Sequence, residues 1–265
     1  MAYAAGRRLL IKQYGVIMKK LISAIGLSLL SFGAIADDHA PNMAALETYG
    51  CTYNEDKDLN DLLSLSKKWD RFASKNFSMP YQGYVLTPFY MNANSQADVY
   101  WVGVSPSFEA QGTTQREERI EGESLNAEFS EVLNCSSHGQ WGMRLVMESD
   151  EEVPERGVVS FQACTLKEGV TPAKINAADE KMNAVRKKMG FTGNITRWFL
   201  FSSRTDSFTA DFLEVSEFES LSQRGEIFDT AIKNGMGQTY NSLYGDLMEC
   251  QNTGTSLYVS VGGKD

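Results

Sequence analysis

The residue types best suited to chemistry, histidine and cysteine, are scarce in this chain. It holds two histidines and four cysteines among 265 residues. His39 lies near the start of the chain, and His138 lies in the short segment between Cys135 and Trp141. A Ser–His–Asp triad or a histidine-rich metal site needs imidazoles that this sequence does not supply. We therefore expect neither kind of site, and we interpret His138 as a surface loop residue in preference to a general base.

Two short segments resemble chemical motifs but fail at required positions. Residues 54–58 resemble the opening of a calcium-binding EF-hand loop, but Leu59 stands where glycine is needed and Leu65 where a bidentate glutamate is needed. A solvated turn explains the segment better, with Asp58 as the N-cap of the following helix. Residues 103–107 lack the second glycine of a nucleophile elbow. The motifs therefore assign no catalytic residue and no metal.

A secretory signal is readable from Met18 onward. Two lysines precede an apolar run over residues 21–35, which ends in the small-residue cleavage motif Ala-Ile-Ala at Ala36. The run is too short and too rich in Ser and Gly for a membrane span. We expect a true start near Met18, cleavage after Ala36, and an exported protein that is periplasmic or extracellular. Arg7 and Arg8 faintly resemble a twin-arginine signal, and on either interpretation residues 1–36 are excluded from the fold.

Without this leader the chain is strongly acidic. The full sequence has a net charge of −9, and residues 1–36 hold five basic and no acidic side chains, so the mature chain carries −14. Such a surface repels phosphate backbones, so we do not expect nucleic acid as a partner. No later segment is apolar enough to span a membrane, which predicts a soluble mature protein.

The remaining chain consists of two copies of one sequence pattern. Cys51-Thr52 recurs as Cys164-Thr165, and each pair precedes apolar residues at three- and four-residue steps, which predict an amphipathic helix. Residues 123–135 align without gaps with residues 238–250. Strand-like runs rich in aromatic and β-branched residues fall at matching places. These runs are 84–86, 99–102 and 141–147 in the first half, and 198–201, 212–215 and 256–261 in the second.

Each half thus has the order strand–helix–strand–strand–helix–strand, which is that of the ferredoxin-like split βαβ motif. Such a unit leaves one apolar sheet face bare, and two units would bury these faces against each other. The chain therefore resembles the dimeric α+β barrel superfamily, with the dimer fused into one polypeptide, and is similar to secreted bacterial proteins of unassigned activity. The expected fold is α+β, with ferredoxin-like repeats at 44–147 and 157–263 and an acidic linker at 148–156.

The resemblance implies a disulfide pairing. By themselves, four cysteines in an exported protein allow three connectivities. In the split βαβ sheet the first and last strands are neighbours, which places Cys51 beside Cys135 and Cys164 beside Cys250 at the separation that a disulfide prefers. Loops of these lengths would each contribute about 4–5 kcal/mol in the chain-entropy model. Four buried thiols are the alternative. We expect structural cysteines, because no Cys-x-x-Cys motif occurs.

The resemblance also implies where a ligand would bind. In dimeric α+β barrels the space between sheet and helices often holds a small, flat, apolar ligand that a few polar groups orient. The ligand-binding candidates in this chain are Tyr53, Asp98, Trp101 and Arg197, although ordinary core packing explains aromatic strand residues equally well. Related haem enzymes use a proximal histidine, for which we find no placed equivalent, so we expect no cofactor.

Two functions remain open. The first is a non-catalytic exported protein that binds a small apolar molecule or serves as a scaffold for a protein partner. The alternative is an enzyme resembling the cofactor-independent monooxygenases or lyases of the superfamily, which use a few polar and aromatic side chains. Likeness of fold is weak support for activity, so we favour binding. Arg197 aligns with Gly83 or Tyr84, so the two halves differ at this position. A polar pocket present in only one half would favour a protein with a single binding site over a symmetric scaffold. The sequence leaves the oligomeric state and the ligand open.

Overall fold

The computed structural model describes residues 43–91, 97–149, 151, 154–203 and 208–264. The predicted leader at 1–36 lies outside the described residues, as does His39. All of the described residues belong to one compact unit of the chain.

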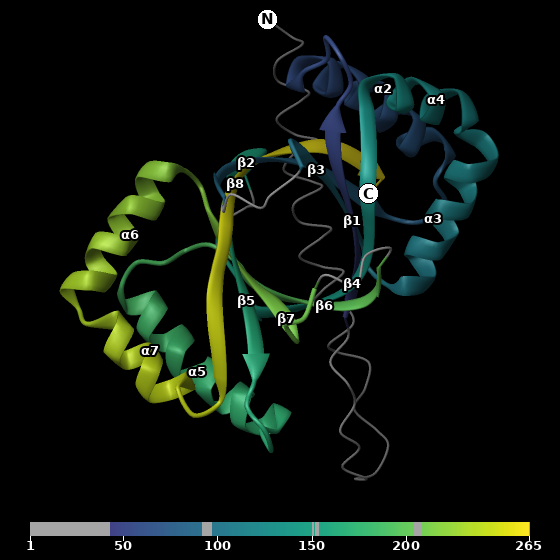
Figure 1. Ribbon diagram of the computed structural model, residues 1–265. Helices are drawn as coiled ribbons and strands as arrows, with labels where there is room; N and C mark the ends of the chain where they lie inside the picture. Colours follow the sequence, from purple (N-terminus) through teal and green to yellow (C-terminus); the bar gives the residue numbers. More distant parts are fainter. Residues whose placement is uncertain (1–42, 92–96, 150, 152–153, 204–207, 265) are drawn as a thin grey trace, which may run out of the picture. The chain divides into compact units, whose positions relative to one another are not determined.

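In the described residues, eight antiparallel strands form a closed barrel in the order β1-β3-β2-β8-β5-β7-β6-β4 (Figure 1). Each half of the chain contributes four adjacent strands, and the halves join where β2 pairs with β8 and β4 pairs with β6. The sequence predicts that two apolar sheet faces meet. The structure adds that the sheet edges also pair, so both faces line one shared interior. The strands are β1 (Ala44–Tyr53), β2 (Tyr81–Met91), β3 (Val99–Ser105), β4 (Leu133–Met147), β5 (Arg156–Leu166), β6 (Ile195–Ser203), β7 (Phe212–Phe218) and β8 (Met248–Lys264).

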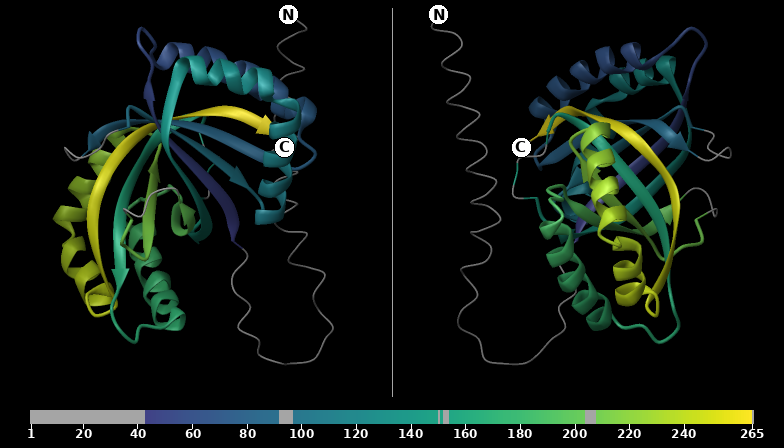
Figure 2. Two further views of the ribbon diagram at one scale, coloured as in Figure 1. Left: turned by 45° about the vertical axis from the view of Figure 1, so that its right-hand side comes forward. Right: turned by 90° about the vertical axis from the view of Figure 1, so that its left-hand side faces the viewer.

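Two groups of helices lie outside the barrel on opposite sides (Figures 1 and 2). The sequence predicts two helices in each half, and the second of these is divided in both halves. The division falls at Gly122 in the first half and near Gly235 in the second, where φ is 64°, a left-handed conformation that glycine adopts without strain. The helices are α2 (Leu59–Asn76), α3 (Phe108–Glu121) and α4 (Glu123–Val132) on one side, and α5 (Pro172–Lys188), α6 (Leu221–Lys233) and α7 (Met236–Tyr244) on the other.

Local sequence explains where the first helix of each half begins. Asp58 caps α2: its carboxylate accepts from the backbone N–H groups of Asn60 and Asp61, and Asp61 accepts in return from the N–H of Asp58. This reciprocal capping box confirms the predicted N-cap. α5 begins at Pro172, whose missing N–H costs nothing in the first turn.

The last strand of each half begins earlier than the sequence predicts. β4 starts at Leu133 and not at 141, and β8 starts at Met248 and not at 256. After Leu133 and Met248 the extra residues are mostly polar or small, with low intrinsic strand propensity, so no local pattern marks them. They are strands because they pair with β1 and β5, which run beside them to the sheet edge.

Two disulfides cross these strand pairs. Cys51 bonds to Cys135 with an S–S distance of 2.03 Å, and Cys164 bonds to Cys250 at 2.08 Å. Each bond joins the first strand of a half to the last strand of the same half, and these are the pairs that the fold resemblance implied. No covalent bond among the cysteines links one half to the other.

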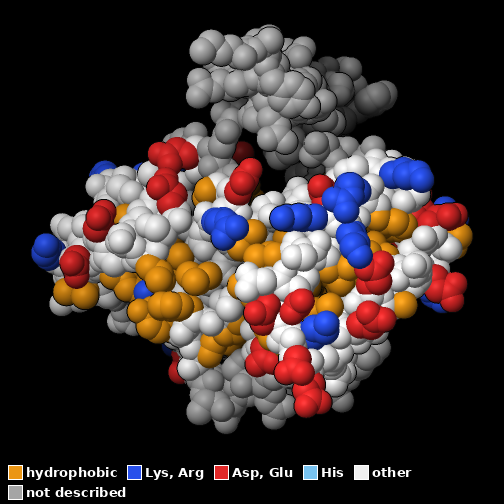
Figure 3. Space-filling model, turned by 90° about the horizontal axis from the view of Figure 1, so that it is seen from above, with side chains coloured by type: hydrophobic (Ala, Val, Ile, Leu, Met, Phe, Trp, Pro, Cys, Tyr) orange, Lys and Arg blue, Asp and Glu red, His pale blue; other side chains and the backbone are white. Residues whose placement is uncertain are grey.

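The apolar core has separate compartments on the two sides of the sheet. One cluster lines the barrel interior and includes Leu46, Val102, Trp141 and Trp198. Other clusters lie between the strands and the outer helices. On the face that Figure 3 shows, hydrophobic side chains form patches between scattered acidic and basic ones. Among the described helices, none has the length and apolar content needed to cross a membrane.

Candidate functional site

Two of the four ligand-binding candidates, Tyr53 and Asp98, meet at the ends of β1 and β3. The backbone N–H of Tyr53 donates to Oδ2 of Asp98 at 3.0 Å. Burial, together with Asp98 and Asp58, raises the pKa of Tyr53 to about 12. The second half repeats the contact, since Leu166 N–H donates to Asp211 Oδ2 at 2.6 Å. In both halves, an aspartate just before the third strand thus accepts a hydrogen bond from the backbone at the end of the first strand. This shared contact indicates that Asp98 stabilises the strand end.

Trp101 lies in the apolar core between the sheet and helices of the first half. Its Nε1 donates to the hydroxyl of Tyr81 at 3.2 Å. Its ring packs edge-on against Trp69 at a centroid distance of 4.8 Å and against Phe129 at 5.7 Å. Aromatic rings therefore occupy the space between sheet and helices in this half.

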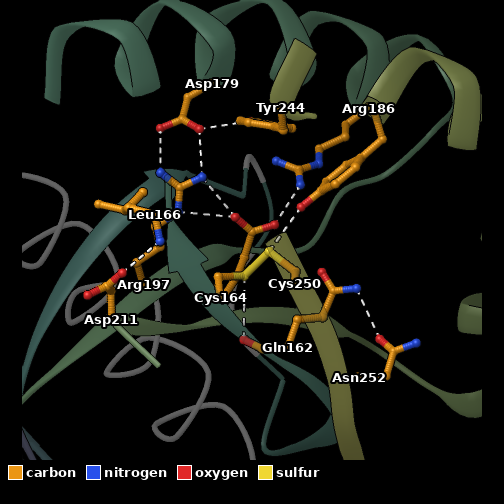
Figure 4. Close-up of a disulfide and its surroundings, with 12 residues drawn as sticks. Gln162, Cys164, Leu166, Asp179, Arg186, Arg197, Asp211, Tyr244, Cys250 and Asn252 are labelled. Atoms are coloured by element: carbon orange, nitrogen blue, oxygen red, sulfur yellow. Dashed lines mark hydrogen bonds and ion pairs between the residues drawn. A yellow bond between two sulfur atoms is a disulfide. The ribbon is translucent and has the colours of Figure 1, made fainter. Parts of the chain in front are cut away.

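Arg197 lies in the second half, apart from the other three candidates, at the centre of a buried ion network (Figure 4). Its terminal nitrogens donate to both carboxylate oxygens of Asp179, at 2.9 and 2.7 Å. Its Nε and one terminal nitrogen donate to Oε2 of Glu214, at 3.1 and 2.8 Å. The two carboxylates hold the pKa of Arg197 above its ordinary value even though burial opposes this.

Further polar groups complete this network. Arg186 donates to Oε1 of Glu214 at 3.0 Å, the Tyr244 hydroxyl donates to Asp179 at 2.7 Å, and Arg144 approaches Asp179 at 3.4 Å. Burial alone would raise the pKa of Glu214, but Arg186 and Arg197 lower it. Three guanidinium groups thus face two carboxylates, so the network carries an excess of positive charge.

The two halves differ sharply at these positions. Counted from the disulfide cysteine of each first strand, Glu214 occupies the place of Trp101, and its partner Arg197 occupies that of Val85. The sequence alignment matches Arg197 with Gly83 or Tyr84, whereas the strand register matches it with Val85. A hydrophobic pair in the first half is therefore an ion pair in the second.

The space between sheet and helices is open where α6 covers the sheet of the second half. Among its residues α6 has no buried side chain, whereas α3 in the first half buries Ala110, Gln111 and Thr114. A groove of about 680 Å³ lies under α6. Its wall includes Arg186 and Glu214 from the ion network, so the buried charges form part of its lining.

Arg224 of α6 is the most distinctive residue of this groove. Its Nε donates to Ser160 Oγ at 2.9 Å. Its guanidinium lies 4.2 Å from the ring centroid of Phe228 and 5.7 Å from that of Tyr90. None of the ion pairs between described residues includes Arg224. Burial lowers its pKa, but a guanidinium titrates so high that it stays cationic at neutral pH.

Sequence reasoning missed most of these residues. Asp179 and Arg186 stand seven residues apart on the buried face of α5, among apolar side chains such as Met182. Charged residues on an apolar helix face are a signal that could have been read. Arg224 has no such signal, because its neighbour Tyr90 is distant in sequence and the two meet only in the folded barrel.

The structure also corrects the interpretation of His138. This residue lies in β4, its ring stacks on Tyr49 at 4.0 Å, and its Nε2 is 3.4 Å from Oε2 of the buried Glu47. Glu118 of α3 belongs to the same cluster, since burial and Glu47 raise its pKa to about 7 although His138 opposes the shift. His138 is therefore part of a half-buried acidic cluster and not of a surface loop.

The described residues of the α6 groove do not supply an axial histidine for a haem. No histidine occurs among the described residues that line the α6 groove, and His138 lies in the other half of the chain. In the part of the chain that the structure describes, no three His, Cys, Asp or Glu side chains gather in a way that could hold a metal ion.

Known proteins resemble this chain in fold and not in sequence. No protein-family model and no curated protein match it. A provisionally assigned monooxygenase from Lactobacillus acidophilus matches with a TM-score of 0.52 at 8% identity, over 84% of this chain and 96% of its own. A provisionally assigned monooxygenase from Fusobacterium nucleatum matches with 0.49 at 9%, over 85% and 98%. Chlorite dismutase from Candidatus Nitrospira defluvii in complex with imidazole matches with 0.46 at 9%, over 82% and 92%. At such identities the first of these likenesses supports the fold alone: this chain has the dimeric α+β barrel fold.

Proposed function

We propose that this protein binds a small ligand with a flat apolar body and an acidic group, in the groove under α6. The observation that supports this most directly is Arg224, whose guanidinium lies over two aromatic rings in a groove of about 680 Å³ and has no carboxylate partner among the described residues. Ligand sites typically have volumes of about 300–1,000 Å³.

The chemistry of the groove favours an anion attached to a ring system. A guanidinium binds carboxylate, sulfonate or phosphate oxygens through two parallel N–H bonds, and it keeps its charge when partly buried. The rings of Phe228 and Tyr90 are exposed by 42% and 56%, so they offer apolar surface next to that charge. The network behind the groove adds net positive charge through Arg186 and Arg144, which attracts an anion further.

The enzymatic alternative lacks an available base in this groove. Among the described residues that line it, Glu214 is the sole carboxylate, and Arg186 and Arg197 hold its pKa low. Burial raises the pKa of Tyr240, the tyrosine from α7 at the same site, well above the ordinary value. A low-pKa carboxylate and a high-pKa phenol are poor proton acceptors at neutral pH. Binding without turnover is therefore the function that we propose in preference to a monooxygenase-like reaction.

We further propose that the fold arose by fusing two ferredoxin-like units, at 44–147 and 157–263 with the linker 148–156, and that the chain is exported. Both halves share the element order, the disulfide position, and the aspartate at the strand end. Disulfides persist in oxidising compartments, which supports a periplasmic or extracellular location.

The binding proposal can be tested with anilinonaphthalenesulfonate, a flat aromatic anion whose fluorescence rises on binding. Arg224→Gln should weaken its affinity by about tenfold, roughly the worth of one partly exposed charge-assisted contact. The affinity of Arg224→Lys for the dye should lie between those of Arg224→Gln and the wild type, because lysine keeps the positive charge but lacks the planar guanidinium group. Raising the salt concentration should weaken binding to the wild type more than to Arg224→Gln.

Arg119→Gln is the matched control, because Arg119 is an exposed arginine on α3, the helix that follows the third strand in the other half. It should leave the affinity unchanged. Equal affinities for the Arg224→Gln and Arg119→Gln proteins, with unchanged thermal unfolding, would rule out the groove as the anion site. Oxygen uptake during ligand binding would favour the monooxygenase-like alternative instead.

A further inference from the structure

The barrel interior is incompletely filled. A cavity of about 590 Å³ lies inside it, on the opposite side of the sheet from most of the α6 groove, and the two meet at Met91, Thr253 and Gly254. The side chains that point into it come from both halves, and several are only half-buried although they face inward. These half-buried residues are Tyr100, Phe161, Leu200, Phe208 and Leu213. Apolar side chains that remain solvent-accessible inside a closed barrel indicate space that protein atoms do not occupy.

The cavity walls are aromatic and held in position. Trp141 Nε1 donates to Thr48 Oγ1 at 3.0 Å, and Trp198 Nε1 donates to Thr196 Oγ1 at 2.9 Å. Trp141 also packs edge-on against Phe208 at a centroid distance of 5.2 Å. Because both indole N–H groups already have acceptors, the tryptophans contribute apolar surface to the cavity and leave no unmet donor.

His138 is the one imidazole among the described residues that line the cavity. Among the described residues that line the cavity there is no Asp, Glu, Lys or Arg. The remaining polar groups are hydroxyls such as Thr48 and Ser256. An ionised ligand would lose its hydration here without gaining a partner charge, whereas an uncharged one would not. This is the reverse of the α6 groove, where Arg224 favours an anion.

We propose that the barrel interior is a second binding site, specific for an uncharged, flat, largely apolar molecule such as a polycyclic aromatic compound. Aromatic walls already held in place bind such a ligand by ring stacking with little loss of side-chain entropy. The hydroxyl groups at the wall can orient one polar substituent. The two sites adjoin at Met91, Thr253 and Gly254, which line both, and they have opposite charge preferences.

Phenylnaphthylamine tests the proposal, because it is anilinonaphthalenesulfonate without the sulfonate. It should bind the wild type with an affinity that does not change with salt concentration. Energy transfer from tryptophan to the bound dye should fall in Trp198→Phe, since Trp198 lines the cavity. Ala163→Phe places a ring in the cavity from β5 and should weaken binding of the neutral dye by at least about tenfold.

Two comparisons make the test decisive. Ala163→Phe should leave anilinonaphthalenesulfonate binding unchanged, and Arg224→Gln should leave phenylnaphthylamine binding unchanged. If Ala163→Phe fails to fold, Ala210→Leu fills the same cavity with less added volume and carries the same expectation. The proposal is overturned if phenylnaphthylamine binds the cavity-filled variant as tightly as it binds the wild type, or if Arg224→Gln no longer binds phenylnaphthylamine.

Discussion

Arg197 and Glu214 occupy places that Val85 and Trp101 fill in the other half of the barrel. Apolar residues of similar volume often stabilise a fold as well as a buried ion pair does, because each charge loses its hydration on burial. The second half nevertheless keeps Arg186, Arg197 and two carboxylates, with most of their hydrogen bonds satisfied, and Arg144 of the first half adds a third guanidinium group. Because Arg186 and Glu214 line the α6 groove, we infer that this ion network sets the charge of the groove wall. The equivalent apolar pair in the first half lies beside a filled core.

Glu118 provides a test at the residue scale, because burial and Glu47 raise its pKa to about 7 from an ordinary value of 4.5. The folded state then holds the proton more tightly than the unfolded state. The contribution of protonated Glu118 to the free energy of unfolding is therefore complete below about pH 4.5, and it is lost as the pH rises through about 7. Glu118→Gln cannot ionise, so at pH 8 it should raise the free energy of unfolding by about 2–3 kcal/mol relative to the wild type.

Urea unfolding at pH 4.5 and pH 8 measures this difference, which should nearly vanish at the lower pH. Glu121→Gln on the same helix is the control, since Glu121 is exposed and should show little difference at either pH. A wild type and Glu118→Gln protein with parallel stability profiles would show that this carboxylate ionises normally in the folded state.

At the scale of elements, the two halves differ most in how deeply α6 and its counterpart α3 pack against the sheet. Gly235 ends α6 in a left-handed turn, and none of its described side chains is buried, so it lies less deeply against the sheet than α3 does in the other half, with Leu221 and Ile227 partly buried against the core. The offset leaves the groove open and leaves Phe228 and Ile232 exposed. A helix with so little buried surface is held mainly by its neighbours α7, β5 and β7.

The disulfides give a test at this scale, because each closes a loop of similar length, with sequence separations of 84 and 86. Replacing Cys164 and Cys250 together by alanine should lower the free energy of unfolding by about 3–5 kcal/mol, chiefly by freeing the unfolded chain. The equivalent replacement of Cys51 and Cys135 should cost a similar amount. Denaturant titration of both variants measures this, and a loss below about 1 kcal/mol in either would contradict the expected stabilisation by loop closure.

The whole molecule depends on the two places where the halves meet, β2 with β8 and β4 with β6. These ladders remove the exposed edges that two separate four-stranded sheets would present. They also create the shared interior, since neither half alone encloses it. Because each disulfide lies within one half, the halves are held to each other by the linker and by noncovalent contacts: strand pairing, core packing and polar side-chain contacts such as the Arg144–Asp179 ion pair.

Cutting the linker tests this arrangement. A protease recognition site inserted within 148–156 should allow complete cleavage while the two fragments stay associated, because the ladders and the shared core remain in place. Size-exclusion chromatography of the cut protein should give one peak at the mass of the intact chain, and denaturant should split it into two. Fragments that separate without denaturant would show that the linker, and not edge pairing, keeps the barrel closed.

The amino-acid sequence by itself determined the features that depend on local patterns. Periodicity placed α2 and α5, Asp58 marked the start of α2 as its N-cap, and matching patterns in the two halves led through the fold resemblance to both disulfides. Of the four ligand-binding candidates, the structure brings Tyr53 and Asp98 together and packs Tyr53 against the core cluster that contains Trp101, but it leaves Arg197 apart in the second half. What only the tertiary structure decided was how distant segments meet: the edge pairing that closes the barrel, the offset of α6, and the contact of Arg224 with Tyr90. Helix and strand periods report which side of an element is apolar, but the distance between elements depends on the packing of the whole chain, which no short pattern encodes.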